Sequence, residues 1–173
     1  IIDFINPNNN NQLVRRDDKL IDKLTGEVVA QVTDGISRFV ETNNYADTFG
    51  FQWNHWTDNL SSLRNPDFGH HEVLINRTKF DKFDLVDRTI LECGCGGGDD
   101  TEVLCSLPFS QVHIFDYSSA VDRAKKYIHD KRVIFSQASI YDIPYKDESF
   151  DVVFCHRVLQ HTPDPVLSLK LIC

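Results

Sequence analysis

A glycine turn between an apolar run and two acids is the part of this sequence best suited to chemistry. Residues 89–93 (TILEC) are apolar and prone to form a strand, and Gly94, Gly96 and Gly98 follow directly. Glycine can adopt a positive φ and leaves room for a ligand close to the backbone. A strand, a glycine turn and a helix start in succession predict a cradle for a nucleotide-like ligand.

The charge of this turn limits which ligand it suits. The dinucleotide fingerprint G-x-G-x-x-G would need a third glycine at position 99, where the chain has Asp99. Asp99 and Asp100 suit the dipole of a helix start but would repel a pyrophosphate at the same amides. We therefore expect a cationic nucleoside ligand, which disfavours the alternative of a nicotinamide-dependent oxidoreductase.

The motif of Glu92, Gly94, Gly96 and Gly98 resembles the first motif of the Rossmann-like (class I) S-adenosylmethionine-dependent methyltransferases. The resemblance implies an α/β fold with a doubly wound, mainly parallel sheet, of which strands 1 to 4 are present. It also implies S-adenosyl-L-methionine as the cofactor and S-adenosyl-L-homocysteine as the product. Cys95, inside the turn, is implied as a further cofactor contact.

A second strand, at residues 112–116, ends in Asp116 about twenty residues after the first glycine. From this position a carboxylate can accept hydrogen bonds from both ribose hydroxyls. The alternative role is a helix cap, but Ser118 and Ser119 already supply one. We expect Asp116 to bind the ribose, with Tyr117 beside it at the cofactor.

Residues 137–145 are similar to the segment that contacts adenine in this family. Ser139 stands where family members usually carry an acid, and its hydroxyl would accept a hydrogen bond from the adenine amino group more weakly than a carboxylate. Ile140, the next residue, is expected at the cofactor as well. Asp142 comes too late to replace the missing acid and is expected to be a solvated turn residue.

Residues 150–155 predict a fourth strand buried on both faces, and residues 156–165 resemble the loop that follows this strand in small-molecule methyltransferases. His156 and His161 are candidates for contacting the methyl donor or acceptor. His161 could accept a proton from an acceptor hydroxyl or amine. A structural role is the alternative for both, because alignment alone can accelerate an in-line methyl transfer.

Residues 43–54 are similar to the aromatic segment that joins leader and catalytic domain in one subgroup of the family. Tyr45, Phe51 and Gln52 lie off its apolar helical stripe and are expected to close over the cofactor. An aromatic face beside a sulfonium would gain about 0.5–2 kcal/mol. Arg77 could reach the cofactor's carboxylate in the family manner or pair with the acid four residues later.

The amino-terminal part resembles the short zinc-ribbon leader of the same subgroup, with short β segments around a turn at Gly26. No cysteine precedes Cys93, so the ligands of a zinc ribbon are missing. We therefore expect no metal site, and a hairpin held by packing alone. The sequence predicts a degenerate leader (1–44), a helical cap (45–85) and a partial methyltransferase domain (86–173).

Net charge, apolar runs and cysteine spacing indicate which class of substrate and which location to expect. The net charge of −8 argues against nucleic acid as the main substrate and favours a small molecule. No apolar run approaches the roughly 20 residues of a membrane span, and the five cysteines lack Cys-x-x-Cys spacing, which favours a reducing, cytoplasmic location. We expect methyl transfer to an oxygen or nitrogen of a small molecule. The alternative is a non-catalytic or truncated cofactor-binding or scaffold module.

The sequence predicts fewer strands than the fold of the family contains. The family fold has seven strands in the order 3-2-1-4-5-7-6, whereas this sequence supplies strands one to four before it ends at residue 173. We therefore expect a truncated chain whose fourth strand presents an unpaired apolar edge. A homodimer or a missing C-terminal segment would cover that edge.

Overall fold

The computed structural model describes residues 2–41, 50–51 and 69–173. Its strands are β1 (Leu13–Arg16), β2 (Lys19–Asp22), β3 (Val28–Thr33), β4 (Ile36–Arg38), β5 (Thr89–Cys93), β6 (Gln111–Asp116), β7 (Val133–Gln137) and β8 (Val152–Phe154). Its helices are α2 (His70–Thr78), α3 (Asp99–Cys105), α4 (Ala120–Tyr127) and α5 (Pro165–Ile172), with 3-10 turns η3 (Phe80–Lys82) and η4 (Leu159–His161). No helix in these three ranges is long and apolar enough to cross a membrane.

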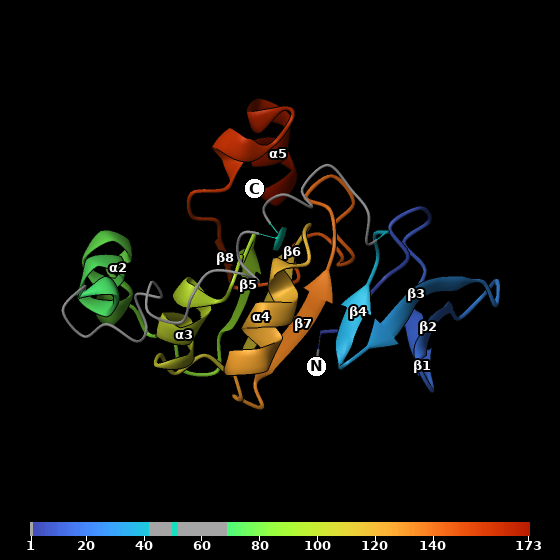
Figure 1. Cartoon of the computed structure of the whole chain (residues 1–173), viewed down its shortest axis with the longest axis horizontal. Helices are drawn as coiled ribbons and strands as arrows, with labels where there is room; N and C mark the ends of the chain where they lie inside the picture. The colour runs from blue at the N-terminus through green and yellow to red at the C-terminus, as the bar shows by residue number, and fades with distance from the viewer. Residues whose placement is uncertain (1, 42–49, 52–68) are drawn as a thin grey trace.

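The strands form one eight-stranded sheet in the order β1-β2-β3-β4-β7-β6-β5-β8 (Figure 1). The strands from β4 to β8 run parallel, whereas β1 to β4 pair antiparallel. The order β7-β6-β5-β8 is the 3-2-1-4 order of a Rossmann-like methyltransferase, which confirms the predicted α/β fold class. The predicted turn at Gly26 connects β2 to β3, and a further turn at Gly35 connects β3 to β4.

The leader joins the cofactor-binding part through a strand pair that the sequence did not predict. β4 lies parallel to β7, with Ile36 opposite Phe135 and Arg38 opposite Gln137. The Arg38 guanidinium also contacts the Asp122 carboxylate of α4 and donates 2.9 Å to Gln137 Oε1. Backbone pairing and an ion pair therefore attach the leader to the edge of the parallel sheet.

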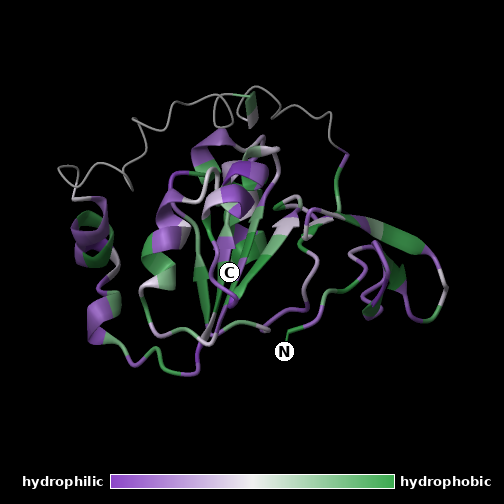
Figure 2. Cartoon of the chain, turned by 60° about the horizontal axis from the view of Figure 1, so that its bottom comes forward, coloured by the Kyte–Doolittle hydropathy of each residue, from purple (hydrophilic) through white to green (hydrophobic). Residues whose placement is uncertain are grey.

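Helices cover one face of the parallel strands, where α3 and α4 lie against β6 and β7 and α2 lies beside α3 (Figure 1). The apolar core on this face includes Ile90, Leu104, Ile114, Val121 and Phe135. In Figure 2 the central strands are mainly apolar in colour, whereas the helices mix polar and apolar residues. This is the pattern expected when each helix buries one stripe against a sheet.

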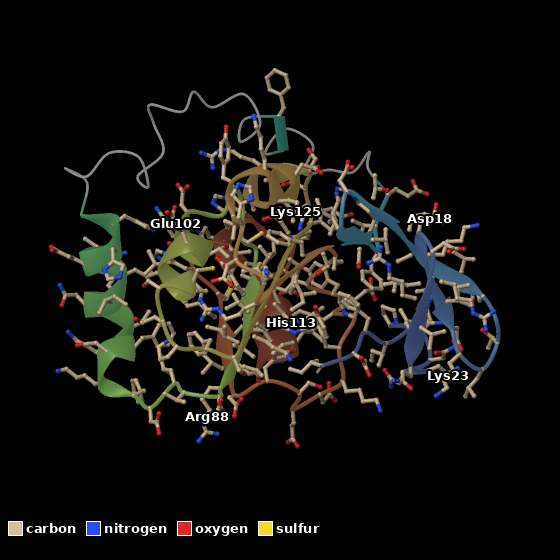
Figure 3. The ribbon with its side chains drawn as sticks, turned by 90° about the horizontal axis from the view of Figure 1, so that it is seen from below. Asp18, Lys23, Arg88, Glu102, His113 and Lys125 are labelled. Atoms are coloured by element: carbon tan, nitrogen blue, oxygen red, sulfur yellow. The ribbon has the colours of Figure 1, made fainter. Side chains whose placement is uncertain are left out.

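The opposite face of the sheet is covered by irregular chain together with Leu159 of η4 and Ile172 of α5. Its core contains Leu91, Phe115, Ile140 and Tyr145, against which Phe4 from the amino-terminal segment packs. His113 of β6 lies within this face, near the centre of the molecule in Figure 3. The buried imidazole contacts Tyr145 Oη at 2.9 Å through Nδ1 and Gln111 Oε1 at 3.0 Å through Nε2.

The sequence predicts a leader held by packing alone, but the structure shows that buried hydrogen bonds also hold it. The Asp22 carboxylate at the end of β2 is fully buried and accepts hydrogen bonds from the side-chain amides of Asn6, Asn9 and Asn11. It also accepts from the backbone N–H groups of residues 24 and 25. Burial alone would raise the pKa of Asp22, but these hydrogen bonds together lower it well below its usual value. An ionised carboxylate therefore ties the asparagine-rich loop to the β2–β3 turn.

The predicted fourth strand is shorter and less buried than expected. β8 covers only three residues, and β5 is its one partner among the described strands, with Ile90 opposite Val152. Val153 is 42% exposed, so the prediction that this strand is buried on both faces is wrong. Within the described part of the chain, β8 is therefore an edge strand. That a homodimer or a missing C-terminal segment covers this edge stays a prediction.

Candidate functional site

The carboxyl ends of β5 and β8 meet at the point where the strand order reverses. From β5 the chain proceeds outward through β6 to β7, and it then returns to place β8 on the other side of β5. Open α/β sheets bind ligands in the crevice at this switch point. The glycine turn (residues 94–98) follows β5, and the loop of residues 156–165, here called the histidine loop, follows β8. The topology therefore brings these two predicted segments together.

Direct contact between the two segments is visible at Gly94. Gly94 has φ +80°, and a Cβ added there would lie 2.4 Å from a methyl carbon of Val158 in the histidine loop. Gly98 has φ +93°, and an added Cβ would lie 2.7 Å from Ile128 and 3.0 Å from Ala124. Glycine at both positions thus allows close protein packing as well as the left-handed backbone of a tight turn.

Asp116 faces the glycine turn from the end of β6. Its Oδ2 accepts a 2.8 Å hydrogen bond from Gly96 N, and its Oδ1 accepts from the backbone and hydroxyl of Ser118. Burial raises the pKa of Asp116 more than these hydrogen bonds lower it. The Asp116 carboxylate, which the sequence predicts to bind the cofactor ribose, is therefore hydrogen-bonded to the backbone of the turn.

Glu92 lies deeper than a direct ligand contact would require. It is 2% exposed, and Thr101 Oγ1 of α3 donates a 2.6 Å hydrogen bond to its Oε2. Burial raises the pKa of Glu92 to about 8, the Thr101 hydrogen bond opposes this rise, and the carboxylates of Asp100, Asp116 and Asp99 add to it. Glu92 thereby fastens the strand before the turn to the helix after it.

Arg123 of α4 holds the turn from the other side and was missed by the sequence analysis. Its Nη1 donates 2.9 Å to the carbonyl of Gly97 and lies 3.5 Å from the carboxylate of Asp99. The side chain is only 7% exposed. An arginine within an amphipathic helix offers no sequence signal that it reaches a turn 26 residues earlier.

The remaining predicted adenosine contacts lie on the neighbouring loops. The Tyr117 carbonyl accepts 3.1 Å from Gln137 Nε2, and Ser139 Oγ accepts 3.1 Å from the backbone N–H of Tyr141. Ser139 and Ile140 are 8% and 7% exposed, so each has little surface to offer a ligand without a local shift. Cys95 is buried in the turn, and burial raises the pKa of its thiol.

The predicted histidine loop carries a cluster that joins three distant segments. Asp100, in the first turn of α3, contacts His70 Nε2 at 2.7 Å through Oδ1 and His156 Nδ1 at 2.8 Å through Oδ2. Arg77 Nη1 lies 3.5 Å from His156 Nε2. The structure thus places Arg77 at His156, and Asp100 and His70 at this position are further residues that the sequence analysis missed.

The other predicted site residues are not brought into this cluster. His161 is exposed in η4, and Phe51 is 63% exposed. Tyr45 and Gln52 lie outside the described residues. Of the two candidate bases, His156 is therefore the one that lies in the Asp100 cluster.

The charge of the site fits a cationic nucleoside. The carboxyl groups of Glu92, Asp99 and Asp116 lie around the glycine turn, and the guanidinium of Arg123 lies beside Asp99. Ionised carboxylates at the turn would attract the sulfonium and the ammonium of a bound cofactor and would repel a pyrophosphate. These residues therefore fit S-adenosylmethionine better than a ligand that carries a pyrophosphate.

Known proteins share this fold and part of this sequence. Residues 91–173 match the methyltransferase domain family. The 27-O-demethylrifamycin SV methyltransferase of Amycolatopsis mediterranei is 36% identical over 80 residues, which cover 43% of this chain and 29% of that protein. The tRNA U34 carboxymethyltransferase of Nautilia profundicola is 27% identical over 89 residues, which cover 50% of this chain and 30% of that protein.

A solved structure extends the likeness of the fold. The putative S-adenosyl-L-methionine-dependent methyltransferase of Methanococcus maripaludis superposes with a TM-score of 0.60 at 17% identity, covering 77% of this chain and 60% of that one. The sequence matches above span less than a third of each relative. Residues 91–173 therefore belong to the methyltransferase domain family, with the Rossmann-like fold of class I S-adenosylmethionine-dependent methyltransferases.

Proposed function

We propose that this chain is part of an enzyme that transfers a methyl group from S-adenosylmethionine to an oxygen or nitrogen of a small-molecule acceptor. The observation that carries the proposal is the hydrogen bond between the Asp116 carboxylate and Gly96 N, since it holds a ribose-binding acid against the glycine turn. The cofactor supplies an activated methyl group when bound. Asp116 would bind its ribose, and Tyr117, Ser139 and Ile140 would border its adenine.

The residues at the switch point would align the acceptor with the methyl group. Alignment of donor and acceptor is the main requirement of an in-line displacement. His156 lies at the carboxyl end of β8, where it can face an acceptor, and Arg77 beside it could hold a carboxylate of the cofactor or of the acceptor. His161 remains a second candidate for proton acceptance on the same loop.

A small-molecule acceptor and a cytoplasmic location are supported by composition. The net charge is −8, which is unfavourable for binding a phosphate backbone. The five cysteines are all free, as expected in a reducing compartment. The relative named for tRNA makes nucleic acid the acceptor class to test against. Methyl transfer from a radiolabelled donor to simple phenols and amines, compared with transfer to bulk tRNA, separates the two classes.

Titration calorimetry with S-adenosylhomocysteine tests the cofactor part of the proposal. Asp116→Asn should weaken binding about 10- to 100-fold, because a hydrogen bond to a charged group contributes about 1.5–3 kcal/mol. Asp142→Asn is the matched control, since this acid is exposed in the adjacent loop, and its affinity should equal that of the parent. Equal affinities for the parent and Asp116→Asn would remove Asp116 from the site.

Two further results would favour other functions. Absence of adenosylhomocysteine binding by the folded parent protein would favour a scaffold module. Selective thermal stabilisation by NAD would favour an oxidoreductase. Both ligands can be compared in one thermal-shift experiment.

A further inference from the structure

Asp100 holds two imidazoles that come from distant parts of the chain. Its Oδ1 lies 2.7 Å from His70 Nε2 in α2, and its Oδ2 lies 2.8 Å from His156 Nδ1 after β8. The three side chains are 11%, 16% and 19% exposed in the order Asp100, His70, His156. The cluster lies beside the carboxyl end of β8, and its hydrogen-bond partners determine which imidazole nitrogens carry hydrogens.

The identity of the partners determines the tautomer of His156. A carboxylate accepts hydrogen bonds, so His156 Nδ1 must carry the hydrogen that it shares with Asp100. A guanidinium has no acceptor, so the Arg77 Nη1 located 3.5 Å from His156 Nε2 faces the lone pair of that nitrogen. The neutral His156 is therefore the Nδ1–H tautomer, with Nε2 available to accept a proton.

The same reasoning gives His70 a different role. Its Nε2 must donate to Asp100 Oδ1, which occupies the second carboxylate oxygen and prevents the carboxylate from turning away from His156. His71, the next residue of α2, instead contacts Ser106 Oγ at 3.1 Å. Only one of the two adjacent histidines thus joins the cluster, which provides a matched control on the same helix.

Arg77 occupies the position next to His156 Nε2 that the hydroxyl or amine of an acceptor would have to take. It is exposed on α2, and its contact with Nε2 is at the limit of a hydrogen bond. An acceptor hydroxyl could replace the guanidinium at Nε2 while Arg77 remains nearby. His161 is exposed in η4.

We propose that Asp100 is a positioning residue that orients His156 as the proton acceptor for the methyl acceptor, with His70 locking the Asp100 carboxylate. This inference rests on the proposed methyl transfer. As the bond between the acceptor oxygen or nitrogen and the methyl carbon forms, the carbon–sulfur bond breaks and its electron pair stays on sulfur. The acceptor proton moves to His156 Nε2, and Nδ1–H stays bonded to Asp100, which stabilises the imidazolium.

The first test observes the tautomer directly in the protein without acceptor. Long-range ¹H–¹⁵N correlation spectra of histidine-labelled protein distinguish Nδ1–H from Nε2–H, and His156→Gln assigns the signal. The parent should show the Nδ1–H form at His156. Asp100→Asn should lose it, because an amide has only one accepting oxygen for two N–H donors, whereas His71→Gln should keep it. An Nε2–H tautomer in the parent would overturn the inference.

The second test separates positioning from support of the fold. With the simple phenol or amine that is methylated in the screen above, Asp100→Asn should lower kcat about 10²- to 10⁴-fold. The KM for that acceptor and the affinity for S-adenosylhomocysteine should stay near the parent values. His70→Gln should give a smaller loss of kcat, and His71→Gln none.

The outcomes distinguish this inference from the proposed function. If the parent binds no S-adenosylhomocysteine and methylates nothing, the proposed function fails. If the parent is active and Asp100→Asn retains its kcat, the role assigned to Asp100 is wrong while the methyltransferase remains. A loss of adenosylhomocysteine binding equal to the loss of kcat would also overturn the role, because Asp100 would then support the cofactor site instead.

Discussion

The carboxylate of Glu92 and the hydroxyl of Thr101 meet at 2.6 Å inside the protein, one at the end of β5 and the other in α3. Both side chains are almost fully buried, at 2% and 0% exposure. The glycine turn lies between them in sequence, so this hydrogen bond sets the distance that the turn must span. It also places a titratable group where ionisation is costly.

The pH dependence of stability should show this cost. The pKa of Glu92 is 4.5 in an unfolded chain and about 8 in the folded protein, so the folded state binds the extra proton between these values. The free energy of unfolding should therefore fall as pH rises from 4.5 through 8, by about 1.4 kcal/mol per pH unit from this group. Glu92→Gln keeps an acceptor for Thr101 and should abolish this slope, making the variant more stable than the parent above pH 8.

Urea denaturation from pH 5 to pH 9 measures the effect. Glu102→Gln provides the control, because Glu102 is an exposed carboxylate on the same helix (labelled in Figure 3) and should leave the slope unchanged. Parallel stability curves for Glu92→Gln and the parent across this range would contradict the assignment.

His113 should act in the opposite direction at lower pH. Burial lowers its pKa from 6.5 to about 4, so the unfolded chain binds the extra proton between these values. Its contribution to stability is complete above pH 6.5 and is lost as pH falls through 4. Between pH 4.5 and 6.5 the Glu92 and His113 contributions have opposite slopes and partly cancel in the parent.

His113→Gln should therefore lose less stability than the parent when pH is lowered from 6.5 to 4, even though its stability at pH 7 is reduced by imperfect packing. His129→Gln, at an exposed histidine, is the control. Chemical denaturation at half-unit pH steps gives the comparison. A variant-to-parent difference that is constant with pH would show that His113 titrates normally.

Asp22 should stabilise the leader by holding the asparagine-rich loop against the β2–β3 turn. Asp22→Asn removes the charge and one accepting oxygen while three asparagine amides remain directed at the side chain. Hydrogen exchange of the backbone N–H groups of residues 24 and 25 should accelerate at least about tenfold, with smaller changes in α3 and α4.

Asp18→Asn is suited as the leader control, because Asp18 is exposed in the β1–β2 turn (Figure 3). Its exchange rates should match those of the parent. Unchanged exchange in Asp22→Asn would mean that packing holds the leader after all.

Gly98 should tolerate no side chain. In Gly98→Ala the left-handed backbone costs roughly 1–2 kcal/mol, and the new Cβ also meets Ile128 and Ala124. Gly26→Ala has a similar φ of +75° with nothing within 4 Å, so it isolates the backbone cost. Thermal unfolding should show a clearly larger loss for Gly98→Ala; equal losses would mean that α4 moves aside without cost.

The sequence predicted the parts of this protein that are encoded locally. The apolar run before Gly94 and the acids after Gly98 are contiguous, so the strand, turn and helix could be placed without knowledge of the rest. Asp116 could be placed because it ends the adjacent strand of a known strand order. The order β7-β6-β5-β8 followed from the family resemblance and is confirmed.

The sequence could not predict contacts that depend on distant chain segments. Asp100 was interpreted as a helix-dipole residue because its partners, His70 and His156, are 30 and 56 residues away. Asp22 showed no signal, because its partners are asparagines of a loop whose composition indicates only a turn. The length of β8 was overestimated because its apolar pattern continues past the residues that pair with β5.

The parallel pairing of β4 with β7 has a thermodynamic consequence. Backbone hydrogen bonds connect neighbouring strands throughout the sheet from β1 to β8. The leader strands and the parallel strands are therefore joined by the pairing of β4 with β7. Melting of the leader would leave the backbone of β7 without a partner on that side, ready to pair with another molecule. We therefore expect the leader to unfold together with the parallel strands and to protect β7 from pairing with another molecule.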